Sequence, residues 1–241
     1  MTPLQAIFFD IDDTLYSTSE FAARARRASM EAMVALGVRM PAEDLVRELE
    51  EVISEFTSNY EHHFDKLLLR IPKKAWEGVN RAVLIAGAIV AYHETKSRDL
   101  APYPDAVDLL RRLSRTPVVR GVITSGLEIK QAEKLVRLKI LEYLSPGAIF
   151  ISDQIGISKP NRKLYMRACD STGVTPKAAM YVGDHPAHDI DPANAIGMAT
   201  VLVKRGGKHA GDAGKTRAAH EVGGMAELGE ILKREYGLSL A

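Results

Sequence analysis

Short apolar segments alternate with amphipathic segments along much of the chain. Buried strands are predicted where β-branched and other apolar residues cluster, at 6–10, 118–123, 148–151, 179–182 and 200–203. Between them, apolar residues recur every three or four positions, which predicts helices at 105–113, 129–138, 163–172 and 192–196. Strands that alternate with helices pair in parallel, because each crossover helix returns the chain to the same edge of the sheet. We therefore expect an α/β fold with a doubly wound parallel sheet.

One long segment breaks this alternation directly after the first strand. No alternating, β-branched strand pattern occurs between Tyr16 and Arg98. Instead, the spacing predicts helices over 21–36, 41–56 and 72–92, with a less regular stretch at 59–70. A segment of this length is sufficient for a small domain. The sequence thus predicts a core domain of residues 1–16 and 98–241, interrupted by an all-helical domain of residues 17–97.

Composition and charge narrow the class of protein. Hydrophobic residues make up 46% and charged residues 26% of the 241 positions, as in globular chains that bury a core. The 32 Lys and Arg residues nearly balance the 31 Asp and Glu residues, so the chain lacks the basic excess of nucleic-acid or membrane-surface binders. Its single cysteine, Cys169, excludes an internal disulfide. Without a signal peptide or membrane-spanning pattern, we expect a cytoplasmic protein with no membrane or nucleic-acid partner.

The predicted strands are followed by residues that suit one kind of chemistry. Successive strands lead to Asp10 and Asp12, to Thr124 and Ser125, to Lys159, and to Asp184 and Asp189. In doubly wound folds the site lies at the carboxyl ends of the strands. Carboxylates suit Mg²⁺, while hydroxyl and ammonium groups hold phosphoryl oxygens. One carboxylate can attack phosphorus and another can transfer a proton, so the set favours phosphoryl transfer.

Each of these groups also has an ordinary structural role. Asp12 and Thr124 precede predicted helices and fit helix caps. Lys159 precedes a proline-initiated helix, where a solvated surface lysine is common, and Asp184 and Asp189 fit solvated loop acids. Four successive strand ends that all carry such groups are hard to explain by structural roles alone.

These residues resemble the motifs of the haloacid dehalogenase (HAD) superfamily. Phe8–Leu15 resembles its first motif, Asp-x-Asp-x-Thr after an apolar strand, and Val122–Gly126 resembles the second. Lys159–Pro160 resembles the third motif, and Gly183–Asp189 resembles the fourth in its Gly-Asp-x4-Asp form, with a histidine after the first Asp where a small residue is frequent. The inserted helical segment resembles the C1 cap of subfamily I. The resemblance implies a Rossmann-like core with an inserted helical cap.

The resemblance also implies roles for the acids. Asp10 would be the nucleophile that forms an aspartyl-phosphate, and Asp12 would protonate the leaving group and later activate water. Asp10, the main-chain carbonyl of Asp12, and Asp184 would hold Mg²⁺, and Asp189 would assist directly or through water. Mg²⁺ is therefore the expected cofactor.

The phosphoryl group of the substrate would be bound by three further residues. Thr124 and the backbone amide of Ser125 would bind its oxygens, and Lys159 would neutralise charge on Asp10 and the phosphoryl group. The expected activity is Mg²⁺-dependent hydrolysis of a small phosphomonoester, with a small-molecule phosphate ester as the only expected partner. The alternatives on the same fold are a sugar phosphomutase, which shares all four motifs, and a haloacid dehalogenase-type hydrolase. The resemblance to dehalogenases is weaker, because they lack an acid at the position of Asp12.

The inserted domain would select the leaving group. Its least regular segment contains Tyr60, His62, His63 and Asp65, and Tyr16 lies at its entry. Irregular segments on rigid scaffolds often carry binding residues. We expect His63 to contribute to substrate specificity, with an exposed loop position as the alternative. The identity of the phosphate ester and the oligomeric state are left open by the sequence.

Overall fold

The chain folds into two units, one of which is inserted in the other. The computed structural model describes residues 3–57, 59–207, 209 and 211–240. The first unit, here called the core unit, comprises Met1–Thr18 and Ala101–Ala241, and the second, the helical unit, comprises Ser19–Leu100. The expected division after residues 16 and 97 differs from these limits by two and three residues.

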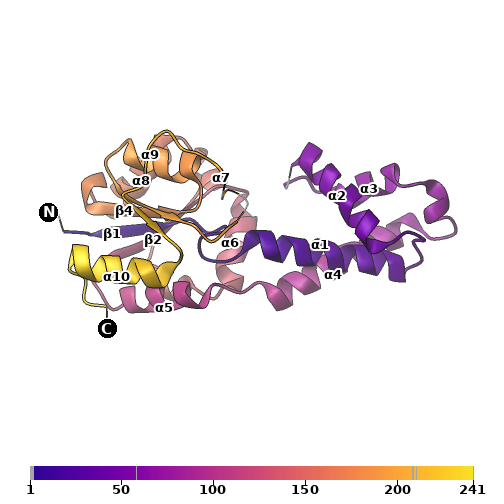
Figure 1. The fold of residues 1–241 in the computed structure, drawn as a ribbon, viewed down its shortest axis with the longest axis horizontal. Helices are drawn as coiled ribbons and strands as arrows, with labels where there is room; N and C mark the ends of the chain where they lie inside the picture. The colour runs from indigo at the N-terminus through magenta and orange to yellow at the C-terminus, as the bar shows by residue number, and fades with distance from the viewer. Residues whose placement is uncertain (1–2, 58, 208, 210, 241) are drawn as a thin grey trace. The chain divides into compact units, whose positions relative to one another are not determined.

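The core unit is built on a parallel sheet (Figure 1). Its six strands follow the order β3-β2-β1-β4-β5-β6, and each neighbouring pair is parallel. The strands are β1 (Ala6–Phe9), β2 (Val119–Thr124), β3 (Ile149–Ile151), β4 (Ala179–Gly183), β5 (Ala199–Val203) and β6 (His220–Val222). The predicted doubly wound α/β fold is thus confirmed, and β6 is a strand that the apolar pattern did not indicate.

Helices cover both faces of this sheet. They are α5 (Pro104–Leu113), α6 (Glu128–Arg137), α7 (Ser152–Ile155), α8 (Arg162–Thr172), α9 (Asp191–Asn194) and α10 (Met225–Tyr236), with a π-helical turn η4 (Pro186–Ile190) and the 3₁₀ turns η2 (Leu141–Tyr143) and η3 (Pro176–Ala178). Figure 1 shows α5 and α10 on one face, and α8 and α9 on the other. Strands β1, β3 and β4 therefore contact apolar side chains on both faces, which explains why they are continuous apolar runs rather than alternating ones.

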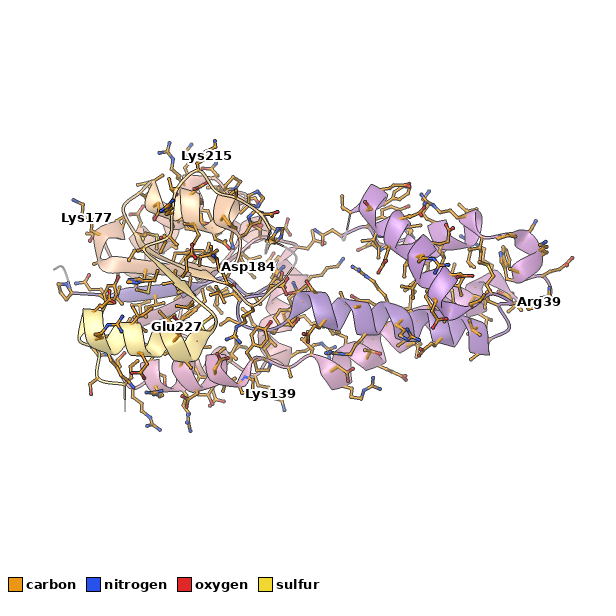
Figure 2. All side chains as sticks on the ribbon, viewed as in Figure 1. Arg39, Lys139, Lys177, Asp184, Lys215 and Glu227 are labelled. Atoms are coloured by element: carbon orange, nitrogen blue, oxygen red, sulfur yellow. The ribbon has the colours of Figure 1, made fainter. Side chains whose placement is uncertain are left out.

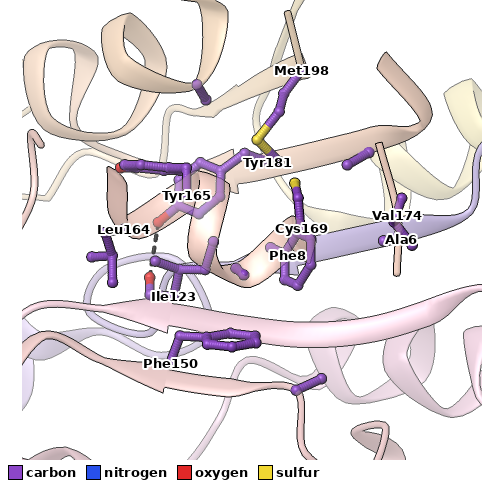
Figure 3. Packing of buried hydrophobic residues seen from close by; sticks show 14 of the residues in the cluster. Ala6, Phe8, Ile123, Phe150, Leu164, Tyr165, Cys169, Val174, Tyr181 and Met198 are labelled. Carbon is purple, nitrogen blue, oxygen red and sulfur yellow. Dashed lines mark hydrogen bonds between the residues drawn. The ribbon is translucent and has the colours of Figure 1, made fainter. Parts of the chain in front are cut away.

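Aromatic packing fixes the central strands. All four residues of β1 are buried, and Phe8 contacts Phe150 edge to face with ring centroids 6.0 Å apart. The rings of Tyr165 and Tyr181 meet in the same way at 4.9 Å. The Tyr181 hydroxyl donates to the carbonyl of Ile123 at 2.9 Å, which joins β4 to β2 across β1 (Figure 3). Each such buried side chain contributes about 1.5–3 kcal/mol to folding, so the strand ends that carry the acids are held by the best-packed part of the sheet.

The second unit is helical throughout its described residues. Its helices are α1 (Thr18–Ala35, whose first residue belongs to the core unit), α2 (Ala42–Phe56), α3 (His63–Arg70) and α4 (Arg81–Asp99), with a 3₁₀ turn η1 (Lys73–Ala75). Leucines from three of these helices, among them Leu45, Leu67 and Leu84, form its core. Within the described residues, no helix of either unit combines the length and apolar character needed to cross a membrane.

The expected continuous helix over 72–92 is wrong. The chain forms only the short turn η1 there and then begins α4 at Arg81, where the Asn80 side chain accepts a hydrogen bond from the amide of Ala82 at 2.8 Å. Gly78 has a φ of +86°, which ends the first turn, and Asn80 is a favoured N-cap residue. By contrast, part of the segment 59–70 that looked irregular forms α3.

Candidate active site

The acids that follow β1 and β4 meet at the carboxyl end of the sheet. Phe9 pairs with Val122 of β2 and with Val182 of β4, so β1 lies between these two strands. The amide of Asp10 continues the ladder by donating to the carbonyl of Val182 at 2.8 Å. Asp10 therefore leaves the sheet next to Asp184, which directly follows β4.

A buried lysine joins two of the acids. The Lys159 ammonium donates to Oδ1 of Asp10 at 2.7 Å and to Oδ1 of Asp189 at 2.8 Å, and the three side chains are at most 11% exposed. Burial alone would lower the pKa of Lys159, but the two carboxylates outweigh burial and raise it. Lys159 therefore stays charged and offsets part of the negative charge of the cluster.

Asp189 is the most deeply buried acid of the site. Its carboxylate lies 3.2 Å from the Tyr181 hydroxyl and accepts a hydrogen bond from the amide of His185 at 3.0 Å. A side chain at Gly183 would place its Cβ only 2.3 Å from Oδ2 of Asp189. Glycine at this position thus allows the carboxylate to lie directly against the end of β4.

The geometry of the acids fits a divalent cation. One carboxylate oxygen each from Asp10, Asp184 and Asp189 lies within 4.8 Å of the other two. Among the described residues, the Asp184 carboxylate has neither an ion pair nor a hydrogen bond (Figure 2 labels its position). Burial first, and then repulsion from the neighbouring carboxylates, raise the pKa of Asp184 to about 8. An all-oxygen donor set with uncompensated negative charge is the kind of site that Mg²⁺ occupies.

Asp10 is also perturbed by its surroundings. Burial raises its pKa to about 7 against the opposing effect of Lys159, and the charges of Asp189 and Asp12 add to the rise. Asp10 and Asp184 cannot both be fully ionised at neutral pH without an added cation. Cation binding and the availability of Asp10 as a charged nucleophile are therefore linked.

Asp12 is held by a second set of groups. The Lys134 ammonium from α6 lies 2.7 Å from both carboxylate oxygens. The hydroxyls of Tyr16 and Thr18 donate to Oδ1 at 2.6 and 2.9 Å, and the Gln131 amide donates to Oδ2 at 3.5 Å. Burial would raise the pKa of Asp12, but Lys134 and the two hydroxyls outweigh it and lower the pKa below its ordinary value of 3.8. Asp12 is therefore a carboxylate in this arrangement.

The predicted phosphate-binding residues lie at the same end of the sheet. Thr124 ends β2, is buried, and donates to the side-chain carbonyl of Gln131 at 3.4 Å. The Ser125 hydroxyl accepts from the Ser158 hydroxyl and from the amide of Lys159, both at 3.2 Å. Ser125 thus ties the loop after β2 to the loop that carries Lys159. The structure brings the predicted core residues together on the core unit.

His63 belongs to the other unit. It is the first residue of α3, and its Nε2 lies 2.7 Å from the carbonyl of Thr57. Its ring meets the Tyr60 ring edge to face at a centroid distance of 5.6 Å. The role of His63 in substrate specificity stays a prediction.

Two residues of the site, Lys134 and Tyr181, are not among those that the sequence predicts. Tyr16 is predicted as a candidate at the entry of the insertion, whereas in the structure its hydroxyl donates to Asp12. A signal for Lys134 exists, because Gln131 and Lys134 are three residues apart and so share one face of the predicted helix with apolar Leu135. Polar side chains within an otherwise apolar helix face indicate a buried polar partner.

Comparison with known proteins decides the family. Residues 7–203 match the family model described as haloacid dehalogenase-like hydrolase. The chain belongs to this family. The matched region contains all four predicted motifs and the complete helical unit, so the haloacid dehalogenase-like resemblance seen in the motifs holds over most of the chain.

Relatives of this haloacid dehalogenase-like chain at 34–43% identity are described as phosphatases. A glyceraldehyde 3-phosphate phosphatase of Methanopyrus kandleri is 43% identical over 84% of this chain and 85% of its own length. A protein with the same description from Pyrococcus furiosus is 36% identical over 98% of this chain and 96% of its own length. The chain is therefore a phosphatase of the haloacid dehalogenase-like type, a hydrolase of phosphomonoesters.

Solved structures support the fold but do not separate the chemistries within it. A HAD phosphatase from Thermococcus onnurineus aligns with a TM-score of 0.65 at 22% identity and covers 95% of this chain and 98% of its own. A 2-haloacid dehalogenase from Pseudomonas syringae aligns with a TM-score of 0.62 at 24% identity and covers 96% of this chain and 99% of its own. Because both chemistries share this fold, the reaction must be argued from the site.

Proposed function

We propose that this protein hydrolyses glyceraldehyde 3-phosphate or a closely related three-carbon phosphate, with Asp10 as the nucleophile. The observation that carries the proposal is the group formed by Asp10, Asp184, Asp189 and Lys159 at the end of the sheet. The substrate is suggested by relatives that are 34–43% identical and are described as glyceraldehyde 3-phosphate phosphatases.

The core unit supplies the groups for a two-step reaction. Asp10 attacks phosphorus and forms an aspartyl-phosphate as the ester P–O bond breaks and the alcohol leaves with a proton from Asp12. Lys159 lies against Asp10 and neutralises charge near the phosphoryl oxygens. Thr124 and the amide of Ser125 bind the remaining phosphoryl oxygens. In the second step, water attacks phosphorus and gives a proton to Asp12; the bond between Asp10 and phosphorus breaks, inorganic phosphate leaves and Asp10 is regenerated.

Asp12 transfers protons in both steps. An alkyl leaving group departs as a poor anion, so protonation by a positioned acid accelerates its departure. The contacts from Lys134 and Tyr16 hold Asp12 as a carboxylate, which is the form that activates water in the second step. For the first step, Asp12 must hold a proton, and this requires its contacts with Lys134 to loosen.

A magnesium ion fits the group of oxygen donors at the carboxyl end of the sheet. Asp10, Asp184 and Asp189, together with the main-chain carbonyl of Asp12, would hold it. When bound, Mg²⁺ shields the phosphoryl oxygens from the carboxylates and orients the phosphoryl group for attack. A cytoplasmic location stays a prediction from the sequence.

Phosphate release from a panel of phosphate esters tests the proposal. The panel contains glyceraldehyde 3-phosphate, glycerol 3-phosphate, phosphoglycolate, glucose 6-phosphate and p-nitrophenyl phosphate, each with Mg²⁺ and with EDTA. We expect Mg²⁺-dependent turnover with the highest kcat/KM for glyceraldehyde 3-phosphate, and only background turnover by Asp10→Asn. A higher kcat/KM for the six-carbon ester would contradict the substrate proposal, and normal turnover by Asp10→Asn would contradict the mechanism.

The contribution of His63 is tested on the same panel. His63→Ala is expected to change the ranking of the esters more than it changes p-nitrophenyl phosphate hydrolysis, because the phosphoryl group is held by residues of the core unit. His93→Ala, a change of an exposed histidine on α4 of the same unit, is the control. An unchanged ranking in His63→Ala would assign specificity to other residues of the helical unit.

A further inference from the structure

Three histidines and an aspartate form a cluster that the phosphatase reaction does not use. His185 follows Asp184 at the end of β4, and His188 lies in the π-helical turn η4. His209 and Asp212 come from the loop between β5 and β6. The ring of His185 stacks between the other two imidazoles, with centroid distances of 4.2 Å to His188 and 4.0 Å to His209.

Two of the imidazoles converge on one carboxylate oxygen. Nδ1 of His209 lies 2.6 Å from Oδ2 of Asp212, and Nε2 of His185 lies 3.8 Å from the same atom. One donor atom each from His185, His209 and Asp212 lies within 4.8 Å of the other two. Donors about 2.1 Å from a shared tetrahedral ion are separated by roughly 3.4 Å, and the two measured distances lie on either side of this value.

A second observation concerns the other ring nitrogen of His185, which is not the one that faces Asp212. Nδ1 of His185 is buried and has no hydrogen-bond partner in the described part of the chain. A buried polar atom without a partner destabilises the fold unless something else satisfies it. His209 and Asp212 also line a cavity of about 450 Å³, together with Asp184, so an ion at the cluster is reachable from solvent.

We propose that His185, His209 and Asp212 form a second metal site for a borderline divalent transition-metal ion such as Zn²⁺. Two imidazole nitrogens and one carboxylate oxygen are donors that Zn²⁺, Co²⁺ and Ni²⁺ prefer, whereas Mg²⁺ prefers oxygen alone. The site is therefore chemically distinct from the all-carboxylate site of Asp10, Asp184 and Asp189. Three protein ligands leave a fourth position open to water or to a ligand in the cavity.

Calorimetric titration with Zn²⁺ tests this site. The protein is stripped with a chelator and titrated in excess Mg²⁺, which occupies the carboxylate site. We expect one Zn²⁺ per chain, and at least tenfold weaker binding by His209→Gln/Asp212→Asn. His93→Gln, a change of an exposed histidine outside the cluster, is expected to bind like the wild type. Far-UV circular dichroism and melting temperature verify that each variant is folded.

A second variant separates the two metal sites. Asp10→Asn removes a ligand of the carboxylate site, so it is expected to lose Mg²⁺ binding and keep Zn²⁺ binding. Equal Zn²⁺ affinity in the wild type and His209→Gln/Asp212→Asn would overturn the second site. Loss of Zn²⁺ binding in Asp10→Asn would place the Zn²⁺ at the carboxylates and would also overturn it. Neither result depends on phosphatase activity, so the proposed reaction is tested separately.

Discussion

Replacement of Asp184 by Asn is expected to stabilise the metal-free protein at alkaline pH while it abolishes catalysis. The half-buried Asp184 carboxylate lies beside two buried carboxylates and, among the described residues, forms no hydrogen bond or ion pair. The amide that replaces it therefore loses no partner and removes one negative charge from the cluster.

The magnitude follows from the spacing of the acids. Two unit charges at the 4.8 Å upper limit of these oxygen separations repel by about 3.5 kcal/mol at an effective dielectric constant of about 20, and closer pairs repel more. Asp184 faces two such neighbours, and the Lys159 ammonium offsets part of their effect. We expect a net gain of about 3 kcal/mol in the free energy of unfolding. At about 2–4 °C per kcal/mol for a chain of this size, the melting temperature rises by roughly 6–12 °C.

The gain in the free energy of unfolding of Asp184→Asn should increase with pH. The pKa of Asp184 is raised from 3.8 to about 8, so the folded protein binds this proton more tightly than the unfolded chain. The contribution of protonated Asp184 to the free energy of unfolding of the wild type is fully present below pH 3.8 and is lost as the pH rises toward 8. The advantage of Asp184→Asn is therefore largest near pH 8.5 and shrinks steadily toward pH 5.

The assay is thermal unfolding in EDTA at pH 8.5, 6.5 and 5. Asp170→Asn, which changes an exposed acid on α8, serves as the control and is expected to leave the melting temperature unchanged. Added Mg²⁺ should raise the melting temperature of the wild type by mass action and have little effect on Asp184→Asn. A melting temperature of Asp184→Asn at or below that of the wild type at pH 8.5, or a gain independent of pH, would refute the reasoning.

Three further changes test the surroundings of the site. Asp12→Asn should reduce kcat/KM on glycerol 3-phosphate by about 10²–10⁴-fold and on p-nitrophenyl phosphate much less, because kcat/KM reports the first step, in which only the alkyl leaving group needs a proton; equal losses in kcat/KM would argue against the proton donation. Lys134→Met removes the strongest opposing charge and so raises the pKa of Asp12. Because the first step needs a protonated Asp12, the alkaline limb of the kcat/KM profile should move to higher pH; an unmoved limb would exclude this coupling. Gly183→Ala forces Asp189 from its position. It should lower the free energy of unfolding by about 1–3 kcal/mol in a denaturant titration and weaken Mg²⁺ binding. A variant with unchanged Mg²⁺ affinity would show that Asp189 tolerates displacement.

The sequence predicted the sheet and the strand-end acids well for a physical reason. The strands near the middle of the sheet are buried on both faces, so they are continuous apolar runs that end where a polar residue such as Asp10 begins. Parallel pairing then brings the carboxyl ends of the strands to one edge of the sheet, and this does not depend on the connecting segments. Strand β6 was missed because it is short and two of its three residues, His220 and Glu221, are polar.

Other parts of the structure could not be predicted from local sequence patterns. Lys134 approaches Asp12 from a helix more than a hundred positions away, and no local pattern encodes that pairing. The break before Arg81 was hidden because apolar residues continue at helical spacing on both sides of it, although Gly78 and Asn80 are local signals of a stop and a start. Periodicity locates apolar faces more reliably than it locates the ends of helices.

The helical unit occupies one uninterrupted stretch of sequence, Ser19–Leu100, and none of the groups proposed to act on phosphorus lies within it. The stretch could therefore be exchanged as a single cassette, with the junctions at its two ends, while every reacting group is retained. A graft of the corresponding stretch from a phosphatase of another preference would transplant leaving-group selection without rebuilding the chemistry.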